Sequence, residues 1–368
     1  MLDSLHRRPR SRGVAPLLAT LTGGRVAGRP PATAATAADR PDPEAPSDVL
    51  DALHEYVPPT YEPQLGVVTR TLLERLELGD HDLILAAADD ERRAYYAAAG
   101  ADERPFLILH YAAFWDVEPV LSRIGLPRLV PPDDVHAMAR GPLAAGGGLW
   151  FADLIVDAAA RTGVPIAPGQ RVLDFGCSSG RVLAALAAWR HDVEWTGCDP
   201  NAAAVAWADA HLPHVTAFES PQEPPLAIGA ASLDLVYALS VWSHFGETQA
   251  VAWLEEMRRV IRPGGALVIT TQGVASVAYY LRHANVTDRY ARSAGYALLS
   301  RGHAYFEAFG EDGDWGVRHP EWGMGFMSAD WLASQTSVHW SLKLLEPARI
   351  DTNQDLVVLV RNERGDAP

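Results

Sequence analysis

Residues 172–180 read Val-Leu-Asp-Phe-Gly-Cys-Ser-Ser-Gly, and this stretch decides the fold. An apolar run ends in an acid and a turn of small residues, and the apolar pattern of residues 182–187 predicts a helix directly behind the turn. Glycines at both ends of the turn, Gly176 and Gly180, permit positive φ angles and a close approach of backbone to a ligand. A strand, a glycine-framed turn and a helix in this order are typical of sites that bind nucleotide-like cofactors.

The composition of the turn disfavours one class of cofactor and favours another. A dinucleotide-binding turn reads G-x-G-x-x-G, whereas this one reads Gly-Cys-Ser-Ser-Gly. The carboxylate of Asp174 would repel a pyrophosphate, but it can accept hydrogen bonds from an ammonium group. A second acid, Asp199, ends the apolar run 193–198, where one carboxylate can accept from both hydroxyls of a ribose. A ligand with an amino-acid end and a ribose indicates S-adenosylmethionine.

With these residues the chain resembles the class I S-adenosylmethionine-dependent methyltransferases of the small-molecule type. The family's acid-x-Gly-x-Gly-x-Gly pattern maps onto Asp174, Gly176, Ser178 and Gly180, with serine in place of the middle glycine, and its ribose acid onto Asp199. The family's fourth-strand, Arg-x-Leu-x-Pro-Gly-Gly and closing-strand segments are similar to residues 232–245, 258–270 and 354–361. The likeness covers about residues 145 to 362.

The resemblance implies a set of cofactor-binding residues. They are Asp174, Gly176, Cys177, Ser178, Gly180, Asp199, Pro200, Glu219, Ser220, Ser240 and Val241. Within this set, residues near Glu219 and Ser220 are expected to meet the adenine, and Ser240 and Val241 to line the sulfur end. Because serine is small, we expect cofactor binding to survive the departure at Ser178.

The spacing of apolar runs predicts an α/β fold with a doubly wound, mostly parallel seven-stranded sheet and an antiparallel last strand, plus an N-terminal helical subdomain. Strands are expected at residues 171–175, 193–198, 214–218, 234–239, 265–271, 338–345 and 354–361. The connection between the last two is too short for a crossover helix, so this pair is predicted to be antiparallel. The ends of the parallel strands would then form one crevice.

Four regions are expected along the chain. Residues 1–47 form a disordered basic, Pro- and Ala-rich extension, and residues 48–148 a helical subdomain with its linker. Residues 149–362 form the S-adenosylmethionine-binding methyltransferase domain, which begins with a helix predicted at residues 149–161, and residues 363–368 form a tail. The aromatic-rich stretch 303–331 is predicted to be a lid over the acceptor side of the crevice, with simple packing on the core as an equal alternative.

His244 is the candidate catalytic residue, because it follows the fourth predicted strand and a near-neutral pKa suits a general base. The alternative is a structural histidine that hydrogen-bonds backbone. The resemblance implies a small organic or natural-product acceptor, methylated most readily at oxygen. The turn at residues 238–241 lacks the Asn/Asp-Pro-Pro-aromatic sequence of enzymes that methylate bases or glutamine, so amide and base N-methylation are disfavoured.

Composition narrows the partners and the compartment. A formal net charge of −15 argues against nucleic acid as a partner, because nucleic acids usually bind to basic surfaces. The sequence contains no run of about 20 apolar residues, so we expect no membrane span. Cys177 and Cys198 are interpreted as buried small residues of a cytoplasmic protein, and no metal-ligand spacing occurs.

Two other function classes stay open at this point. A noncatalytic S-adenosylmethionine-binding regulatory or scaffold protein would use the helical N-terminal half for docking. A nucleotide-dependent oxidoreductase is disfavoured by the missing G-x-G-x-x-G. The sequence leaves the oligomeric state open.

Overall fold

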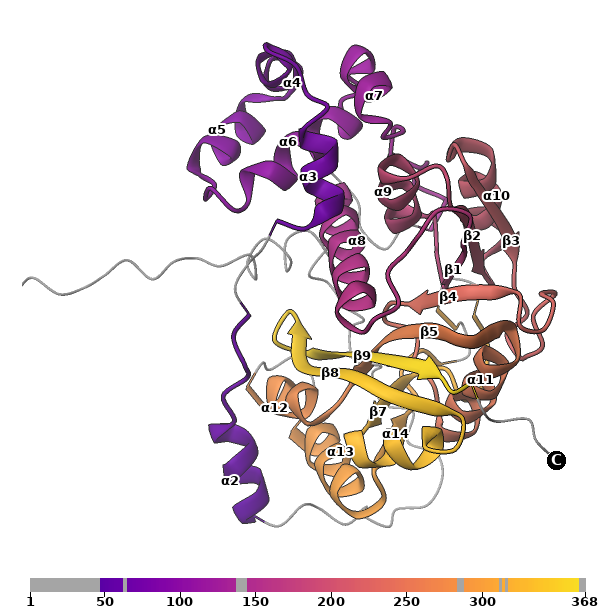
Figure 1. Ribbon diagram of the computed structural model, residues 1–368. Coiled ribbons are helices and arrows are strands. Elements are labelled where there is room, and N and C mark those ends of the chain that lie inside the picture. The colour runs from indigo at the N-terminus through magenta and orange to yellow at the C-terminus, as the bar shows by residue number, and fades with distance from the viewer. Residues whose placement is uncertain are drawn as a thin grey trace, which may run out of the picture.

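A computed structural model of the chain describes residues 47–61, 65–136, 144–282, 288–310, 313–314 and 317–363 (Figure 1). The predicted extension 1–47 lies outside these residues apart from Ser47, and the predicted tail 363–368 apart from Glu363. None of the described helices is long and apolar enough to cross a membrane.

A seven-stranded sheet with the order β3-β2-β1-β4-β5-β9-β8 forms the centre of the fold. Its strands are β1 (Arg171–Phe175), β2 (Glu194–Asp199), β3 (Val215–Glu219), β4 (Leu233–Ala238), β5 (Ile261–Gln272), β8 (Trp340–Ile350) and β9 (Gln354–Arg361). The first five run parallel, whereas β9 pairs antiparallel with both β5 and β8. The predicted mostly parallel sheet with its antiparallel last strand is confirmed.

Alternation of side chains along the central strands divides the core between the two faces of the sheet. Val172 in β1 belongs to the same buried cluster as α8 (Ala144–Arg161) and α9 (Arg181–Trp189). The next residue, Leu173, belongs to a second cluster with α11 (Glu247–Val260) and α14 (Ala329–Thr336). Because both faces are covered by helices, these strands are apolar throughout, which explains their uninterrupted hydrophobic runs.

The strand order reverses between β1 and β4, and this is where an open α/β sheet binds its ligand. Asp174 lies opposite Gly197 of β2 and Tyr237 of β4. Asp199, at the end of β2, lies opposite Glu219 at the end of β3. The two predicted acids therefore stand at one edge of the sheet, at the carboxyl ends of neighbouring strands.

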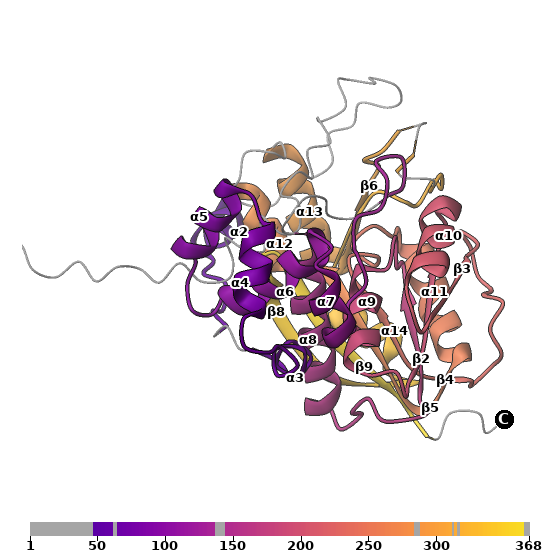
Figure 2. The same ribbon diagram turned by 90° about the horizontal axis from the view of Figure 1, so that it is seen from above.

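The helices before the sheet pack in two places. They are α2 (Ser47–Glu55), α3 (Val67–Leu73), α4 (Asp80–Ala87), α5 (Asp90–Ala98), α6 (Arg104–Phe114) and α7 (Glu118–Ile124). Buried residues of α3, α4, α6 and α7 share one continuous core with α8 and α9. Figure 2 shows α3, α4, α6 and α7 on the left of the molecule, away from α10 (Ala202–His211) and α11 on the right. By contrast, α2 contacts α12 (Val274–Arg282), and Leu53 is buried in a cluster with residues of α12 and α13 (Asp288–Arg301).

Helix α8 begins earlier than the sequence predicts, at Ala144 rather than Leu149. The intervening glycines lower helix propensity, so they were interpreted as part of a linker. The structure gives a packing reason for one of them, because a Cβ on Gly148 would lie 2.6 Å from the carbonyl oxygen of Arg181. Glycine lets α8 approach the start of α9.

The aromatic stretch 303–331 has regular ends and a long loop between them. Strands β6 (His303–Phe306) and β7 (Met324–Met327) pair antiparallel, and the last residues of the stretch belong to α14. We call residues 307–323 the lid loop. Of its predicted aromatic residues, Trp315 lies outside the described residues.

Candidate functional site

The turn after β1 is held by backbone contacts with the next strand. The N–H groups of Gly176 and Cys177 donate to the carbonyl oxygen of Cys198, at 2.8 and 3.0 Å. Gly176 has a φ of +88°, and a Cβ there would lie 2.5 Å from Cγ2 of Val241. Gly180 has a φ of +77° and precedes α9. Both glycines adopt the left-handed conformations that the sequence pattern predicts.

Asp199 organises the turn through both carboxylate oxygens. Its Oδ2 accepts from the backbone N–H of Ser178 at 2.8 Å, and its Oδ1 from that of Asn201 at 2.9 Å. Pro200 stands between Asp199 and Asn201, whose side chain caps α10 by accepting from the N–H of Ala204. Each oxygen of Asp199 keeps a further lone pair, so the carboxylate can still receive a pair of ligand hydroxyls.

Ser178 has a φ of +51°, a conformation that normally favours glycine. Its Oγ lies 3.1 Å from Nδ1 of His136 and donates to the carbonyl oxygen of the same residue at 3.3 Å. Residues near His136 therefore reach the turn, although they precede it by about 40 positions. The side chain that replaces the family's glycine has a binding partner within the protein.

Asp174 is buried and accepts a hydrogen bond from the hydroxyl of Tyr237 at 2.9 Å. Burial raises the pKa of Asp174 to about 8, the Tyr237 hydrogen bond lowers it, the charge of Asp199 raises it and that of Arg181 lowers it. The pKa of Asp199 is also raised, chiefly by burial, against the hydrogen bonds from Asn201 and Ser178. A cationic ligand group would offset the cost of both buried charges.

The expected adenine side lies at the end of β3. The N–H of Ser220 donates to the backbone oxygen of Asp199 at 3.1 Å, which places the Ser220 backbone beside the ribose acid. Ser220 is buried, whereas Glu219 is exposed. The structure therefore brings Glu219 and Ser220 to the same edge as Asp199.

The expected sulfur side lies at the end of β4. Ser240 has a φ of +58°; its N–H donates to Oγ1 of Thr270 at 2.7 Å and its Oγ to Oε1 of Gln354 at 3.1 Å. Val241 is buried and faces Gly176, because its Cγ2 would lie 2.5 Å from a Cβ at Gly176. Ser240 therefore bonds to residues of β5 and β9, and Val241 contacts the turn after β1.

His244 follows them and points its Nδ1 at the backbone oxygen of Gly323, 2.7 Å away. Because a carbonyl oxygen only accepts, Nδ1 carries the proton and the neutral ring keeps its lone pair on Nε2. Burial lowers the pKa of His244, while the Gly323 carbonyl and Asp314 raise it. The ring packs beside Trp322 and Phe309, with centroids 4.8 and 5.7 Å away. His244 therefore meets the lid loop as a neutral imidazole.

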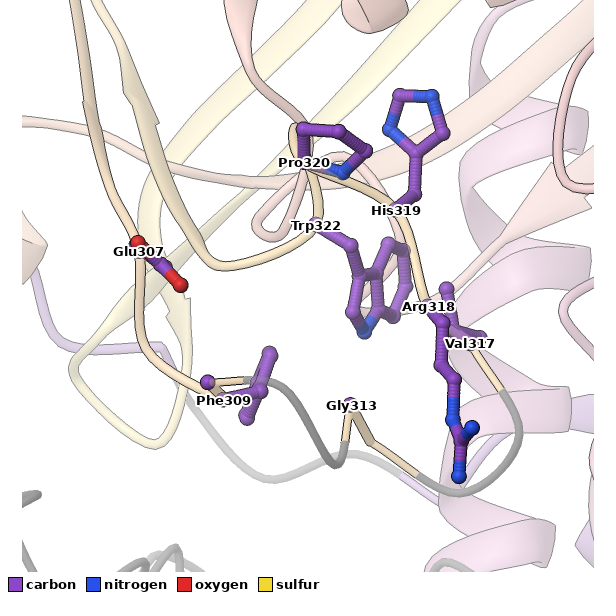
Figure 3. Close-up of a pocket in the computed structure, with 9 residues that line it drawn as sticks. Glu307, Phe309, Gly313, Val317, Arg318, His319, Pro320 and Trp322 are labelled. Atoms are coloured by element: carbon purple, nitrogen blue, oxygen red, sulfur yellow. The ribbon is translucent and has the colours of Figure 1, made fainter.

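Residues of the lid loop line a partly open pocket of about 200 Å³ (Figure 3). Its walls are Glu307, Phe309, Gly310, Gly313, Val317, Arg318, His319, Pro320 and Trp322. In Figure 3 the indole of Trp322 points into this space, and its buried Nε1 has no hydrogen-bond partner among the described residues. Asp314 raises the pKa of both Asp199 and His244, so the loop borders the ribose acid as well.

Contacts with distant segments hold the lid loop in place. The N–H of Arg318 donates to Oε1 of Gln222 at 2.9 Å, which ties the loop to the segment after β3. The N–H of Gln249, in the first turn of α11, donates to Oε2 of Glu321 at 2.8 Å. The cavity therefore has a fixed wall on the expected acceptor side.

Three residues of the site had no role in the sequence prediction. Tyr237 lies within a predicted strand, but only the pairing of β1 with β4 places it opposite Asp174. His136 lies in the predicted linker, and no periodic pattern connects it to the turn. Arg181 directly follows Gly180, but its place at the end of the motif gave it no role.

The residues present fit S-adenosylmethionine. Asp174 and Asp199 are buried acids whose hydrogen-bond partners among the described residues are Tyr237, Ser178 and Asn201, so a ligand ammonium and two ribose hydroxyls would complete their partners. In the described ranges, no group of three or more His, Cys, Asp or Glu side chains could hold a metal ion.

Comparisons with known proteins agree with this geometry. Residues 172–265 match the family described as a methyltransferase domain. Similar solved structures include an S-adenosylmethionine-dependent methyltransferase from Methanosarcina mazei, with 15% identity, 54% of this chain and 95% of that chain covered, and a TM-score of 0.38. One from Mesorhizobium loti has 17% identity, coverage of 56% and 96%, and a TM-score of 0.38.

A third structure, described by the conversion of a disulfide bond into a thioacetal group during echinomycin biosynthesis, has 19% identity, coverage of 57% and 83%, and a TM-score of 0.38. The part of the chain that spans residues 172–265 thus matches a methyltransferase domain.

Proposed function

We propose that this methyltransferase acts on a small organic acceptor, of the kind found among natural products, and transfers the methyl group to an oxygen atom. The observation that carries the proposal is the cavity of about 200 Å³ beneath the lid loop, with His244 against its aromatic wall. This volume is below the roughly 300–1,000 Å³ of pockets that hold drug-sized ligands, so it suits a small acceptor. The formal net charge of −15 disfavours a nucleic acid as the acceptor.

The cofactor supplies a methyl group that its sulfonium has already activated, so the protein mainly has to align the acceptor and exclude water. Phe309 and Trp322 offer flat apolar surfaces for an acceptor ring, and the indole N–H of Trp322 offers one hydrogen bond. We assign to His244 the removal of the hydroxyl proton, because its Nδ1 is committed to Gly323 and its Nε2 can accept.

We assign cofactor binding to the residues that the sequence predicts. Asp174 would accept from the ammonium group and Asp199 from the ribose hydroxyls, while Gly176, Cys177 and Ser178 form the floor of the site. Both cysteines are free and buried, which supports a cytoplasmic address.

The proposal is tested by measuring the release of S-adenosylhomocysteine with a panel of phenols, flavonoid-like alcohols, amines and carbon nucleophiles. We expect turnover with hydroxylated rings and an O-methyl group in the product by NMR. Methylation confined to nitrogen or carbon would contradict the assignment of oxygen. Cofactor binding by calorimetry without turnover on any acceptor would instead support the noncatalytic scaffold.

The role of His244 is tested by His244→Gln. Loss of a general base typically lowers kcat by about 100-fold or more, and it would remove the acidic limb of the pH profile while leaving cofactor affinity unchanged. His191→Gln, at an exposed position outside the site, serves as the control. Full turnover of His244→Gln at every pH would make His244 a structural residue.

A further inference from the structure

The pocket that the lid loop lines contains a carboxylate without a partner. Glu307 is one of the lining residues, and none of the residues that the structure describes forms a hydrogen bond or an ion pair with its side chain. In Figure 3 the carboxylate of Glu307 and the rings of Phe309 and Trp322 stand around one open space. An acid that faces aromatic rings across a pocket is suited to a cationic ligand.

The other acids of the loop strengthen this preference. The pKa of Tyr305 is raised to about 12, first by burial and then by the negative charges of Glu307 and Glu321. Asp314 adds a further negative charge directly beside Gly313, which belongs to the pocket wall. The formal net charge of −15 attracts cations to the whole molecule over a longer range. The field around the pocket therefore favours a positive ligand group.

The two lining residues that can carry a positive charge do not neutralise Glu307. His319 is a neutral imidazole, because its Nδ1 accepts from the N–H of Glu321 at 3.0 Å and its Nε2 holds the only ring proton. Arg318 is charged, but its side chain is exposed. Figure 3 shows its guanidinium on the far side of Trp322 from Glu307.

The aromatic rings supply the other half of a cation site. The electron-rich face of a ring attracts an ammonium group within about 6 Å, and tryptophan does so most strongly. The backbone N–H of Trp322 donates to the carbonyl oxygen of His319 at 3.0 Å, and its ring lies against Phe245, 5.6 Å between centroids. A ring that is already held in place loses little entropy when a cation binds over it.

We propose, on the basis of the function proposed above, that the acceptor carries an ammonium group, which binds between the carboxylate of Glu307 and the rings of Phe309 and Trp322. The ring of His244 lies against both of these rings, with centroids 5.7 Å from Phe309 and 4.8 Å from Trp322. A hydroxyl group on the same molecule can therefore reach Nε2 of His244. The acceptor is a compact hydroxylated amine, because a pocket of about 200 Å³ has no room for a large ligand.

The carboxylate of Glu307 also decides which atom of such an acceptor reacts. A neighbouring negative charge raises the pKa of an ammonium group, so the amine stays protonated and has no lone pair to receive a methyl group. The hydroxyl group gives its proton to Nε2 of His244 and remains the nucleophile. An ammonium site in this pocket is therefore consistent with methylation at oxygen.

The test compares three ligands of similar shape that differ in charge: 2-phenylethylamine, phenylacetamide and phenylacetate. Their dissociation constants are measured by NMR titration of the protein saturated with S-adenosylhomocysteine. A cation–π contact and an exposed ion pair together correspond to about 10-fold in affinity. The wild-type protein should bind the amine about 10-fold more tightly than the neutral amide, and phenylacetate more weakly than either.

The variants locate the charge that is responsible. Glu307→Gln should lower the preference for the amine over the amide by about 3-fold, and Phe309→Leu by a similar factor. Glu74→Gln is the matched control, because Glu74 is an exposed acid at the end of α3 and its loss changes the net charge equally. It should leave the preference unchanged. Both glutamates are exposed, so neither change should affect folding.

The proposal is overturned if the wild-type protein binds the three ligands equally, prefers phenylacetate, or binds none of them at millimolar concentration. An unchanged preference in both Glu307→Gln and Phe309→Leu would also overturn it, because the cation would then bind elsewhere. Turnover separates this proposal from the oxygen-acceptor proposal. O-methylation of 4-ethylphenol and tyramine at equal kcat/KM would support oxygen and contradict the ammonium site. Tight binding of 2-phenylethylamine without turnover of any hydroxylated ring would do the reverse.

Discussion

The turn after β1 and the lid loop border the same site, but they are built in different ways. The turn is held by the neighbouring strand: Gly176 and Cys177 donate to Cys198, and Ser178 to Asp199. The lid loop is held by side chains far away along the chain, such as Gln222, which is 96 positions from Arg318. The turn follows from a local pattern, whereas the lid loop depends on the assembled fold.

This difference predicts that the turn tolerates substitution less well than the lid loop. It also separates the two functions: changes in the turn should act on cofactor binding and folding, and changes in the lid loop on the acceptor. The following substitutions test that separation, beginning with the largest effect.

Gly180→Ala should destabilise the protein by about 2–4 kcal/mol, because the φ of +77° strains alanine and its Cβ would lie 2.4 Å from Cδ1 of Leu212. Gly310→Ala in the lid loop is the matched control. It has a φ of +63°, and no atom of the described residues lies within 4 Å of a Cβ there, so only the backbone strain of about 1 kcal/mol remains. Urea unfolding measures the loss of stability in both variants. Equal losses would contradict the expected difference between the turn and the lid loop.

Asp199→Asn should weaken binding of S-adenosylhomocysteine by about 100-fold, since it removes a charge that accepts from Ser178 and Asn201 and is assigned to the ribose. Calorimetry gives the dissociation constant. Asp192→Asn, an exposed acid paired with Arg190, should leave it unchanged. An unaltered constant in Asp199→Asn would place the ribose elsewhere.

Asp174 should make the ligand-free protein less stable as the pH rises. Its pKa is about 8 in the folded protein, against about 4 in the unfolded chain. Asp174 therefore contributes its full stabilisation below about pH 4, and this stabilisation is lost as the pH rises to about 8. Asp153, Asp199 and Asp355 also have raised pKa values and act in the same direction. The informative quantity is therefore the difference from Asp174→Asn.

We expect Asp174→Asn to gain on the order of 1–3 kcal/mol relative to wild type between pH 5 and about pH 8.5, measured by urea unfolding at each pH. The asparagine can still accept from Tyr237 through its amide oxygen. A difference that does not change with pH would show that Asp174 is ionised throughout this range. The same variant should bind the cofactor weakly, because the ammonium group loses its partner.

Trp322→Phe should have the smallest effect. It keeps an aromatic wall but removes the unpartnered N–H, so we expect KM for the acceptor to rise by about 5-fold, equivalent to about 1 kcal/mol, with cofactor affinity unchanged. Val338→Ala, at an exposed position outside the cavity, controls for nonspecific effects. A change in cofactor affinity instead would place the cofactor, and not the acceptor, beneath the lid loop.

The sheet and the acids of the site could be predicted because they follow from local patterns. Apolar runs mark the central strands, so Asp174 and Asp199 were expected at the ends of neighbouring strands, where the strand register places them. The start of α8 was predicted five residues late, at Leu149 instead of Ala144, since the close contact of Gly148 with Arg181 exists only in three dimensions.

The remaining parts of the site depend on contacts across the fold. His136 meets Ser178 across 42 positions, and Tyr237 meets Asp174 across 63. No periodic pattern in the sequence encodes such pairs. The aromatic content of residues 303–331 left a lid and simple packing on the core as equal alternatives. The pocket that the structure shows there depends on contacts with other segments, such as the hydrogen bond from Gln249 to Glu321.

The hydrogen bonds between Ser178 and His136 join the cofactor turn to a segment outside the matched domain. A glycine at this position would have no hydroxyl, and the two parts of the chain would then lose this connection. A ligand that settles on the turn must therefore also act on the backbone around His136. Amide exchange of residues 133–136 should slow when the cofactor binds, so this segment can report occupancy from a distance.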